Sequence, residues 1–143
     1  MVRKLDSLEA WTCGRLVARL AYRLTLQPPL SRHFSLADQI RRAAASIPAN
    51  IAEGYALGTT PQFIRFLRIA LGSATELCTH LELVVELELA PAPLVAEALK
   101  QGNRVVGLLI GLVFSLQRRR GSTRPPSPLP RPLKPTSGEP RSL

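Results

Sequence analysis

The stretch PQFIRFLRIALGSATELCTHLELV, residues 61–84, decides the fold of this protein. Apolar residues recur in it at spacings that alternate between four and three positions. They are Phe63, Leu67, Ala70, Ala74, Leu77, Leu81 and Val84. This spacing aligns the side chains along one side of an α-helix, as in the seam of a coiled coil. The stretch therefore predicts a long helix that packs against other helices.

A second seam follows the sequence Ala-Pro-Ala-Pro at residues 90–93, where the prolines break the preceding helix. Its members are Val95, Leu99, Gly102, Val106, Leu109, Val113 and Leu116. Before residue 61, helical apolar patterns cover residues 13–24 and 36–51. Residues that could cap the N-termini of the first three helices are Asp6 with Glu9, Ser35 with Asp38, and Thr60 before Pro61. Because the connections are short, we predict an all-α fold, an antiparallel up-down four-helix bundle over residues 1–117.

Residues 118–143 differ in composition from the rest of the chain. They hold seven of the 13 prolines, and seven basic residues against one acidic residue. Such a segment cannot bury enough apolar surface to offset the entropy lost on ordering, so we predict a disordered Pro/Arg-rich tail. Its first residues, Arg118, Arg119 and Arg120, could hold RNA, although basic Pro-rich tails often serve solubility alone.

The formal net charge of +9 indicates an anionic partner, such as the backbone of RNA or DNA. No signal peptide is recognised at the N-terminus. The longest uncharged run, residues 105–117, is shorter than the roughly 20 residues needed to span a bilayer. We therefore expect a cytoplasmic protein, and we disfavour both membrane insertion and a membrane-surface role that would combine the basic tail with the apolar fourth helix.

Two predicted helices carry a second apolar stripe beside the seam. The additional residues are Ile64, Leu71, Cys78 and Val85 on the third helix, and Leu94, Ala98, Val105, Leu108 and Leu112 on the fourth. If a bundle buries one stripe per helix, a second stripe requires another subunit. We therefore favour a homo-oligomer over a monomer with wide buried faces.

Arginines form the main candidate binding residues. Arg15, Arg19 and Arg23 recur every four positions, roughly opposite the apolar face of the first helix. Each guanidinium could contact a phosphate oxygen, and the row could follow a nucleic-acid backbone. The alternative is a solvated polar face without a ligand.

Two further arginine pairs, Arg41 with Arg42 and Arg65 with Arg68, lie early in the second and third helices. A cation near a helix N-terminus opposes the helix dipole, at a cost of about 0.3–1 kcal/mol. Either an anionic ligand or an intersubunit salt bridge would offset this cost. The acidic partners would be Glu53, Glu76 or Glu82. We favour the structural pairing here and keep the nucleic-acid role as the alternative.

Pro48 lies inside the predicted second helix and should kink it, freeing the carbonyl of Ala44. Asn50 and Glu53 lie near enough to contact exposed backbone groups. We interpret this as a structural kink rather than a pocket.

No catalytic motif, phosphate loop or dinucleotide fingerprint is present in the sequence. His80 with Glu76 is a lone pair of potential ligands, whereas a bundle metal site needs such pairs on two helices together with further carboxylates. We therefore predict no enzyme activity, no metal site, no cofactor and no small-molecule substrate.

Residues 39–54, QIRRAAASIPANIAEG, and residues 63–77, FIRFLRIALGSATEL, carry a resemblance to a known family. They resemble the four-helix-bundle family of the 23S rRNA intervening-sequence proteins, which also includes the accessory variability proteins of diversity-generating retroelements. The resemblance extends over roughly residues 3–117 and implies a ring-shaped homopentamer with a basic surface. In the retroelement branch it implies binding of a reverse transcriptase and its RNA.

One departure concerns the connection at residues 55–62. It carries no charge here, whereas the family's connection is usually basic, and this weakens the case for nucleic-acid binding at that corner. The leading hypothesis is a non-catalytic oligomeric adaptor for nucleic acid or a nucleic-acid enzyme. The alternative is a protein-binding scaffold with no nucleic-acid role.

Overall fold

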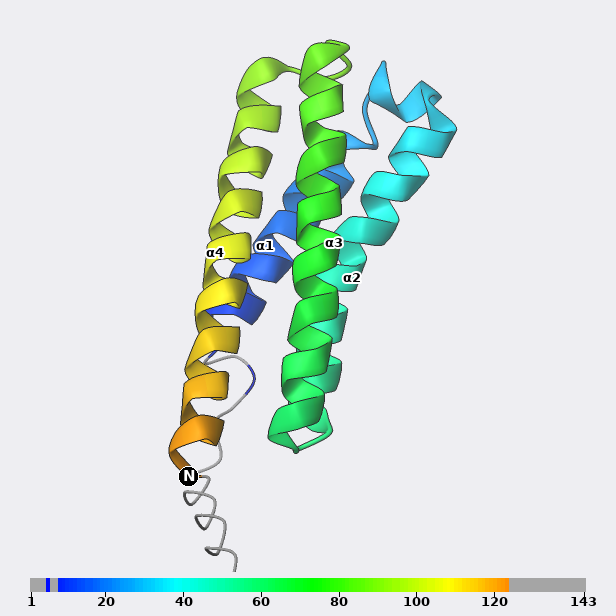
Figure 1. Ribbon diagram of the computed structural model, residues 1–143. Helices are drawn as coiled ribbons and strands as arrows, with labels where there is room; N and C mark the ends of the chain where they lie inside the picture. The colour runs from blue at the N-terminus through cyan, green and yellow to red at the C-terminus, as the bar shows by residue number, and fades with distance from the viewer. Residues whose placement is uncertain (1–4, 6–7, 124–143) are drawn as a thin grey trace, which may run out of the picture.

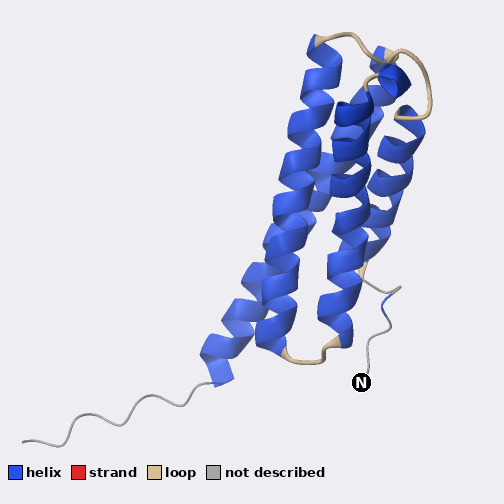
Figure 2. Cartoon of the chain, turned by 90° about the vertical axis from the view of Figure 1, so that its right-hand side faces the viewer, coloured by secondary structure: helices blue, strands red, loops and turns tan. Residues whose placement is uncertain are grey.

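The computed structural model describes residue 5 and residues 8–123 (Figure 1). Its elements are α1 (Glu9–Leu24), the short 3-10 helix η2 (Leu30–Arg32), α2 (Phe34–Ala56), α3 (Thr60–Glu86) and α4 (Ala92–Thr123). The described part contains helices, turns and loops but no strand, as Figure 2 shows. The predicted all-α fold is confirmed.

Short connections make each helix antiparallel to the next (Figure 1). Helix α1 packs on α2 and α4, and α3 packs on the same two helices from the opposite side. The four helices therefore form the predicted up-down bundle, in which every helix has two neighbours around one shared core.

Leucine, isoleucine, valine and alanine build the core. In α3 the predicted seam is buried from Leu67 to Val84, and only Phe63 at its start remains half-buried. In α1 the buried residues include small ones such as Ala10 and Ala21, which let the neighbouring helices approach closely.

Two glycines mark the closest approaches between helices. A Cβ on Gly54 of α2 would lie 2.6 Å from Cβ of Phe66 in α3, and a Cβ on Gly102 of α4 would lie 2.8 Å from Sγ of Cys78. Both distances are shorter than non-bonded carbon and sulfur atoms tolerate. Glycine at these two positions is therefore required by the packing between helices.

The register of α4 differs from the predicted seam. Ala98 and Val105, expected on a second outward stripe, are fully buried, whereas Leu99 and Val106 are only half-buried. Cys78 of α3 is likewise buried. The reason is that α4 contacts both α1 and α3, so it buries a face wider than one stripe. The premise that a bundle helix buries a single stripe is therefore wrong for this chain.

Ser35, predicted to cap α2, lies inside that helix rather than before it. Helix α1 begins at Glu9 after Leu8, α2 begins at Phe34 after His33, and neither preceding residue makes a capping hydrogen bond. Asp6 lies outside the described residues. The carboxylate of Glu9 instead pairs with Arg104 of α4. This contact joins two helices rather than closing one helix end.

Helix α3 begins one residue earlier than predicted, with Thr59 as its N-cap and Pro61 in its first turn. At the other end of the bundle, α4 continues to Thr123, so residues 118–123, predicted to be disordered, are helical. The rest of the predicted tail, residues 124–143, lies outside the described residues. Within the described part, none of the helices is both long enough and apolar enough to cross a membrane.

Candidate nucleic-acid interface

Helix α1 presents Arg15, Arg19 and Arg23 as an exposed row. The buried residues of the same helix, including Cys13 and Val17, point into the core, so the helical period places the arginines outward. None of the three makes an ion pair with another side chain of the described residues 8–123. The row therefore offers guanidinium groups that no carboxylate neutralises.

The first arginine of the row is held in place by an aromatic ring. The guanidinium carbon of Arg15 lies 4.8 Å from the centre of the Trp11 ring. A cation–π contact of this kind contributes about 0.5–1 kcal/mol at an exposed site and orders the side chain without consuming its hydrogen-bond donors.

Arg41 has a structural partner that the sequence did not indicate. Its Nε donates to Oγ1 of Thr25 at 2.7 Å, a terminal nitrogen donates to the Thr25 carbonyl at 3.3 Å, and its guanidinium lies 5.1 Å from the centre of the Tyr22 ring. Thr25 is fully buried at the C-terminal end of α1. A cation is favoured there by the helix dipole. Arg41 therefore ties the end of α1 to α2.

Arg42 lies on the outer face of α2 and pairs with Asp38 at 2.9 Å. Both side chains are largely exposed, so this pair contributes at most about 1 kcal/mol and is weakened by salt. Arg42 therefore differs from the arginines of the α1 row, because it pairs with a carboxylate and they do not within the described residues.

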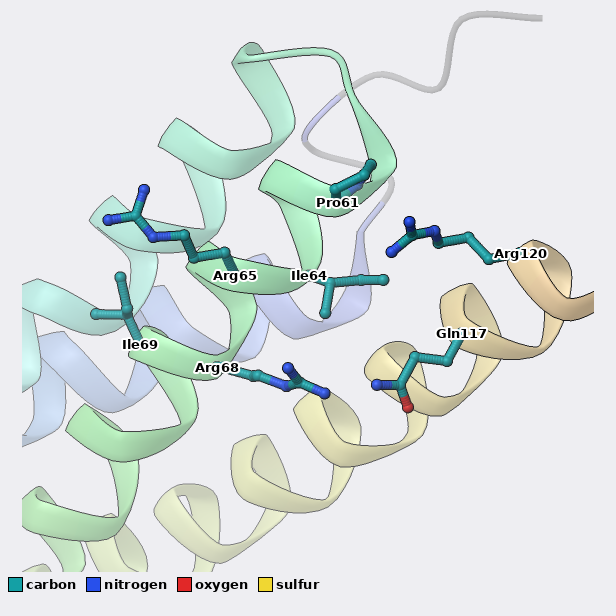
Figure 3. A pocket seen from close by; sticks show the side chains of 7 residues that line it. All are labelled: Pro61, Ile64, Arg65, Arg68, Ile69, Gln117 and Arg120. Atoms are coloured by element: carbon teal, nitrogen blue, oxygen red, sulfur yellow. The ribbon is translucent and has the colours of Figure 1, made fainter.

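The other predicted arginines gather at the opposite end of the bundle. Arg65 and Arg68 of α3 and Arg120 of α4 line a surface groove with a volume of about 460 Å³ (Figure 3). Gln117 lines the same groove. We refer to this site as the α3–α4 groove; its lining residues are Pro61, Ile64, Arg65, Arg68, Ile69, Gln117 and Arg120. Arg118 and Arg119, expected in a disordered segment, lie in the same last turns of α4 and are exposed.

Apolar side chains and the start of α3 complete the α3–α4 groove. Pro61, Ile64 and Ile69 line it together with the polar residues, and none of the lining residues in the described part of the chain is acidic. The N-terminal end of a helix carries a partial positive charge, which adds to that of the arginines. The sequence identified Arg65 and Arg68 but did not show that Gln117 and Arg120 would line the same groove.

Pro48 and Asn50 lie inside α2, where Asn50 contacts Ser46 of the same helix and Ser46 links α2 to α3. The Nδ2 of Asn50 donates to the carbonyl and to Oγ of Ser46, at 2.8 Å each, and Ser46 Oγ lies 2.8 Å from Oγ of Ser73 in α3. Asn50 therefore contacts the carbonyl of Ser46, whereas the carbonyl that Pro48 leaves without its helical donor is that of Ala44. These polar groups satisfy one another, which is the arrangement of a structural link rather than an open binding site.

The remaining polar groups do not assemble a reaction centre in the described part of the chain. His80 lies 3.3 Å from Glu76, and no cluster of three or more potential metal ligands occurs among the residues described. Burial raises the pKa of the Cys13 thiol, although Arg104 partly opposes this shift. Burial also raises the pKa of Cys78. Neither thiol is therefore activated as a nucleophile.

These features define a small four-helix-bundle protein with an exposed arginine row and a basic groove. The chain belongs to the 23S rRNA-intervening sequence protein family, whose family model matches residues 6–111.

A similar solved structure is the 1.70 Å crystal structure of a protein of unknown function from the S23 ribosomal protein family of Bacteroides thetaiotaomicron VPI-5482. It is 26% identical to this chain, with a TM-score of 0.66. The match covers 73% of this chain and 97% of that one. No curated protein matches the chain.

Proposed function

We propose that this protein is a non-catalytic oligomeric adaptor that binds the sugar–phosphate backbone of nucleic acid. The observation that carries the proposal is the exposed row of Arg15, Arg19 and Arg23 on α1, which has no ion-pair partner in the described part of the chain. Guanidinium groups that are not held in ion pairs remain available to attract an anion.

The spacing of the row suits a repeating anion. Four residues of an α-helix rise about 6 Å, so successive guanidiniums recur at a distance similar to that between phosphates along a strand. Contacts of this kind do not distinguish one base sequence from another. Binding releases counterions from the nucleic acid, so the affinity falls steeply as the salt concentration rises. The expected binding is therefore independent of base sequence and strongly dependent on salt.

Assembly and the partner enzyme are further parts of the proposal. The resemblance in residues 39–54 and 63–77 supports a homopentamer that acts with a reverse transcriptase in the cytoplasm. In the structure, Ile110 and Phe114 on the outer face of α4 remain 40% and 60% exposed. Large apolar side chains on one helix face support a contact with another subunit.

The test measures the binding of a labelled RNA to the full chain by fluorescence anisotropy at several salt concentrations. The variant Arg15→Glu/Arg19→Glu should weaken binding about tenfold or more at low salt and flatten the dependence on salt. Arg23 is left unchanged because it shares a small groove with the acidic Glu97.

The matched control is Arg32→Glu with Lys100→Glu, which makes the same change in net charge at exposed positions outside the row. The control should lose much less affinity. Equal losses in the two double variants would mean that the row has no special role, and affinity that is flat with salt would remove phosphate contact as the basis of binding.

The alternative is a protein-binding scaffold with no nucleic-acid role. The exposed Phe114 favours this reading because a large apolar side chain on a surface commonly contacts another protein. Under this reading the chain would not bind RNA even at low salt. Phe114→Ser would reduce the solution mass measured by light scattering under either reading, so the RNA measurement decides between them. Under the leading proposal, the Arg15/Arg19 variant would assemble normally and lose RNA.

A further inference from the structure

The α3–α4 groove differs from the arginine row on α1 in shape and in chemistry. The row is an exposed helix face, whereas the groove is a concave site of about 460 Å³ that combines guanidinium, amide and apolar side chains. A volume of this order is typical of small-ligand pockets and can hold one nucleotide. The groove can therefore receive a single chemical group rather than a long polymer.

Two of the three arginines of the groove, Arg68 and Arg120, lie on the side where α3 and α4 adjoin. Figure 3 shows Arg68 directed toward Gln117, and Arg120 directed toward Pro61 and Ile64 at the start of α3. The early backbone N–H groups of α3 have no partner within the helix and add to this positive end. Among the described residues, those that line the groove include no carboxylate.

A second flank of the groove is more apolar. Arg65 and Ile69 lie there, directed away from Arg68 in Figure 3. Ile69 is 42% exposed, and the guanidinium of Arg65 lies 5.5 Å from the centre of the Phe66 ring. An exposed isoleucine beside an ordered guanidinium offers a surface for the planar face of a base.

We propose that the α3–α4 groove binds the phosphorylated end of a nucleic-acid strand. The terminal phosphate lies against Arg68 and Arg120, and the adjoining nucleotide lies over Ile69. A terminal phosphate carries up to two negative charges and exposes three oxygens, so it uses converging donors better than an internal phosphate with one charge. The assignment rests on the proposed function, but it uses none of the arginines of α1.

The experiment measures the affinity of the full chain for short single strands that carry a phosphate at the 5′ end, at the 3′ end or at neither. One of the phosphorylated strands should bind about tenfold more tightly than the unphosphorylated strand, because charge-assisted hydrogen bonds to the terminal phosphate typically have that effect. Arg68→Glu should abolish the preference, and Ile69→Ser should reduce the affinity for the preferred strand.

Arg19→Glu is the matched control, because it makes the same charge change at an exposed residue of α1. It should weaken all three strands equally and leave the preference intact. Equal affinity for the three strands, or a preference that survives Arg68→Glu, would overturn the terminal-phosphate site while leaving backbone binding in place. Binding of none of the strands would overturn both proposals.

A competition arm separates a strand end from a free nucleotide. A nucleoside monophosphate should displace the phosphorylated strand only at much higher concentration, since it lacks the contacts made by the rest of the strand. If the monophosphate competes as well as the strand itself, the groove binds a free nucleotide and the strand-end assignment is wrong.

Discussion

Replacing Gly54 by alanine tests the closest contact between α2 and α3. In an open helix this change favours folding by about 1 kcal/mol, because alanine is the better helix former. Here the added Cβ would lie 2.6 Å from Cβ of Phe66 and 3.4 Å from Cα of Phe63. The nearest atom is bonded directly to the α3 backbone, so no side-chain rotation relieves the contact and the helices must separate.

Overpacking of this kind typically costs about 1–3 kcal/mol. The matched control is Gly107→Ala in α4, where an added Cβ meets no atom within 4 Å. The control should therefore gain about 1 kcal/mol from helix propensity, whereas Gly54→Ala should be less stable than the control by about 1–3 kcal/mol.

The assay is urea unfolding of both variants and the parent chain, followed by helical circular dichroism. The difference between the two midpoints isolates the clash, because the gain in helix propensity is common to both variants. If Gly54→Ala proved as stable as Gly107→Ala, the close approach of α2 and α3 at Gly54 would be refuted.

Three further predictions concern the core, an interhelical contact and the thiols. Leu109→Asp places an unpaired charge at a fully buried position and should cost more than about 4 kcal/mol; a cooperative melt near that of the parent chain would contradict the packing of α4. Arg41→Met should lower the free energy of unfolding in urea by about 1–3 kcal/mol, because buried Thr25 loses a charged donor, while Arg42→Met should change it by less than about 1 kcal/mol. Burial raises the pKa of both thiols, so stability should fall as the pH rises above about 8.5, where the unfolded thiols ionise and the folded ones do not. Replacing both cysteines by alanine should remove this slope in urea titrations, and an unchanged slope would assign it to other groups.

The helices of this fold were predictable because their patterns are local. The breaks are marked by prolines at positions 28, 29, 61, 91 and 93, and the α3 seam repeats closely enough to identify the buried residues. The α4 register was not predictable in this way. A heptad identifies one stripe, but α4 lies between α1 and α3, and the sequence does not state how far each neighbour extends the buried face.

For the candidate sites too, the features set by a local pattern were predictable and those set by packing between helices were not. Helical spacing placed Arg15, Arg19 and Arg23 on one exposed face, and the structure agrees with that placement. The partner of Arg41, in contrast, is Thr25 at the end of another helix, and Arg104 meets Glu9 across a separation of 95 residues. Contacts between distant segments depend on how the helices pack, which no local pattern encodes.

The closed order of the four helices has a consequence for synthesis on the ribosome. The α1–α2, α2–α3 and α3–α4 contacts join consecutive helices, but α1 also packs on α4, the last helix to be made. Until α4 emerges, the side of α1 that carries Cys13 has no cover, since the Cys13 thiol lies 3.7 Å from the carbonyl oxygen of Gln101 in α4. Closure of the bundle is therefore a late event in translation, and the accessibility of this thiol on stalled nascent chains would report when it occurs.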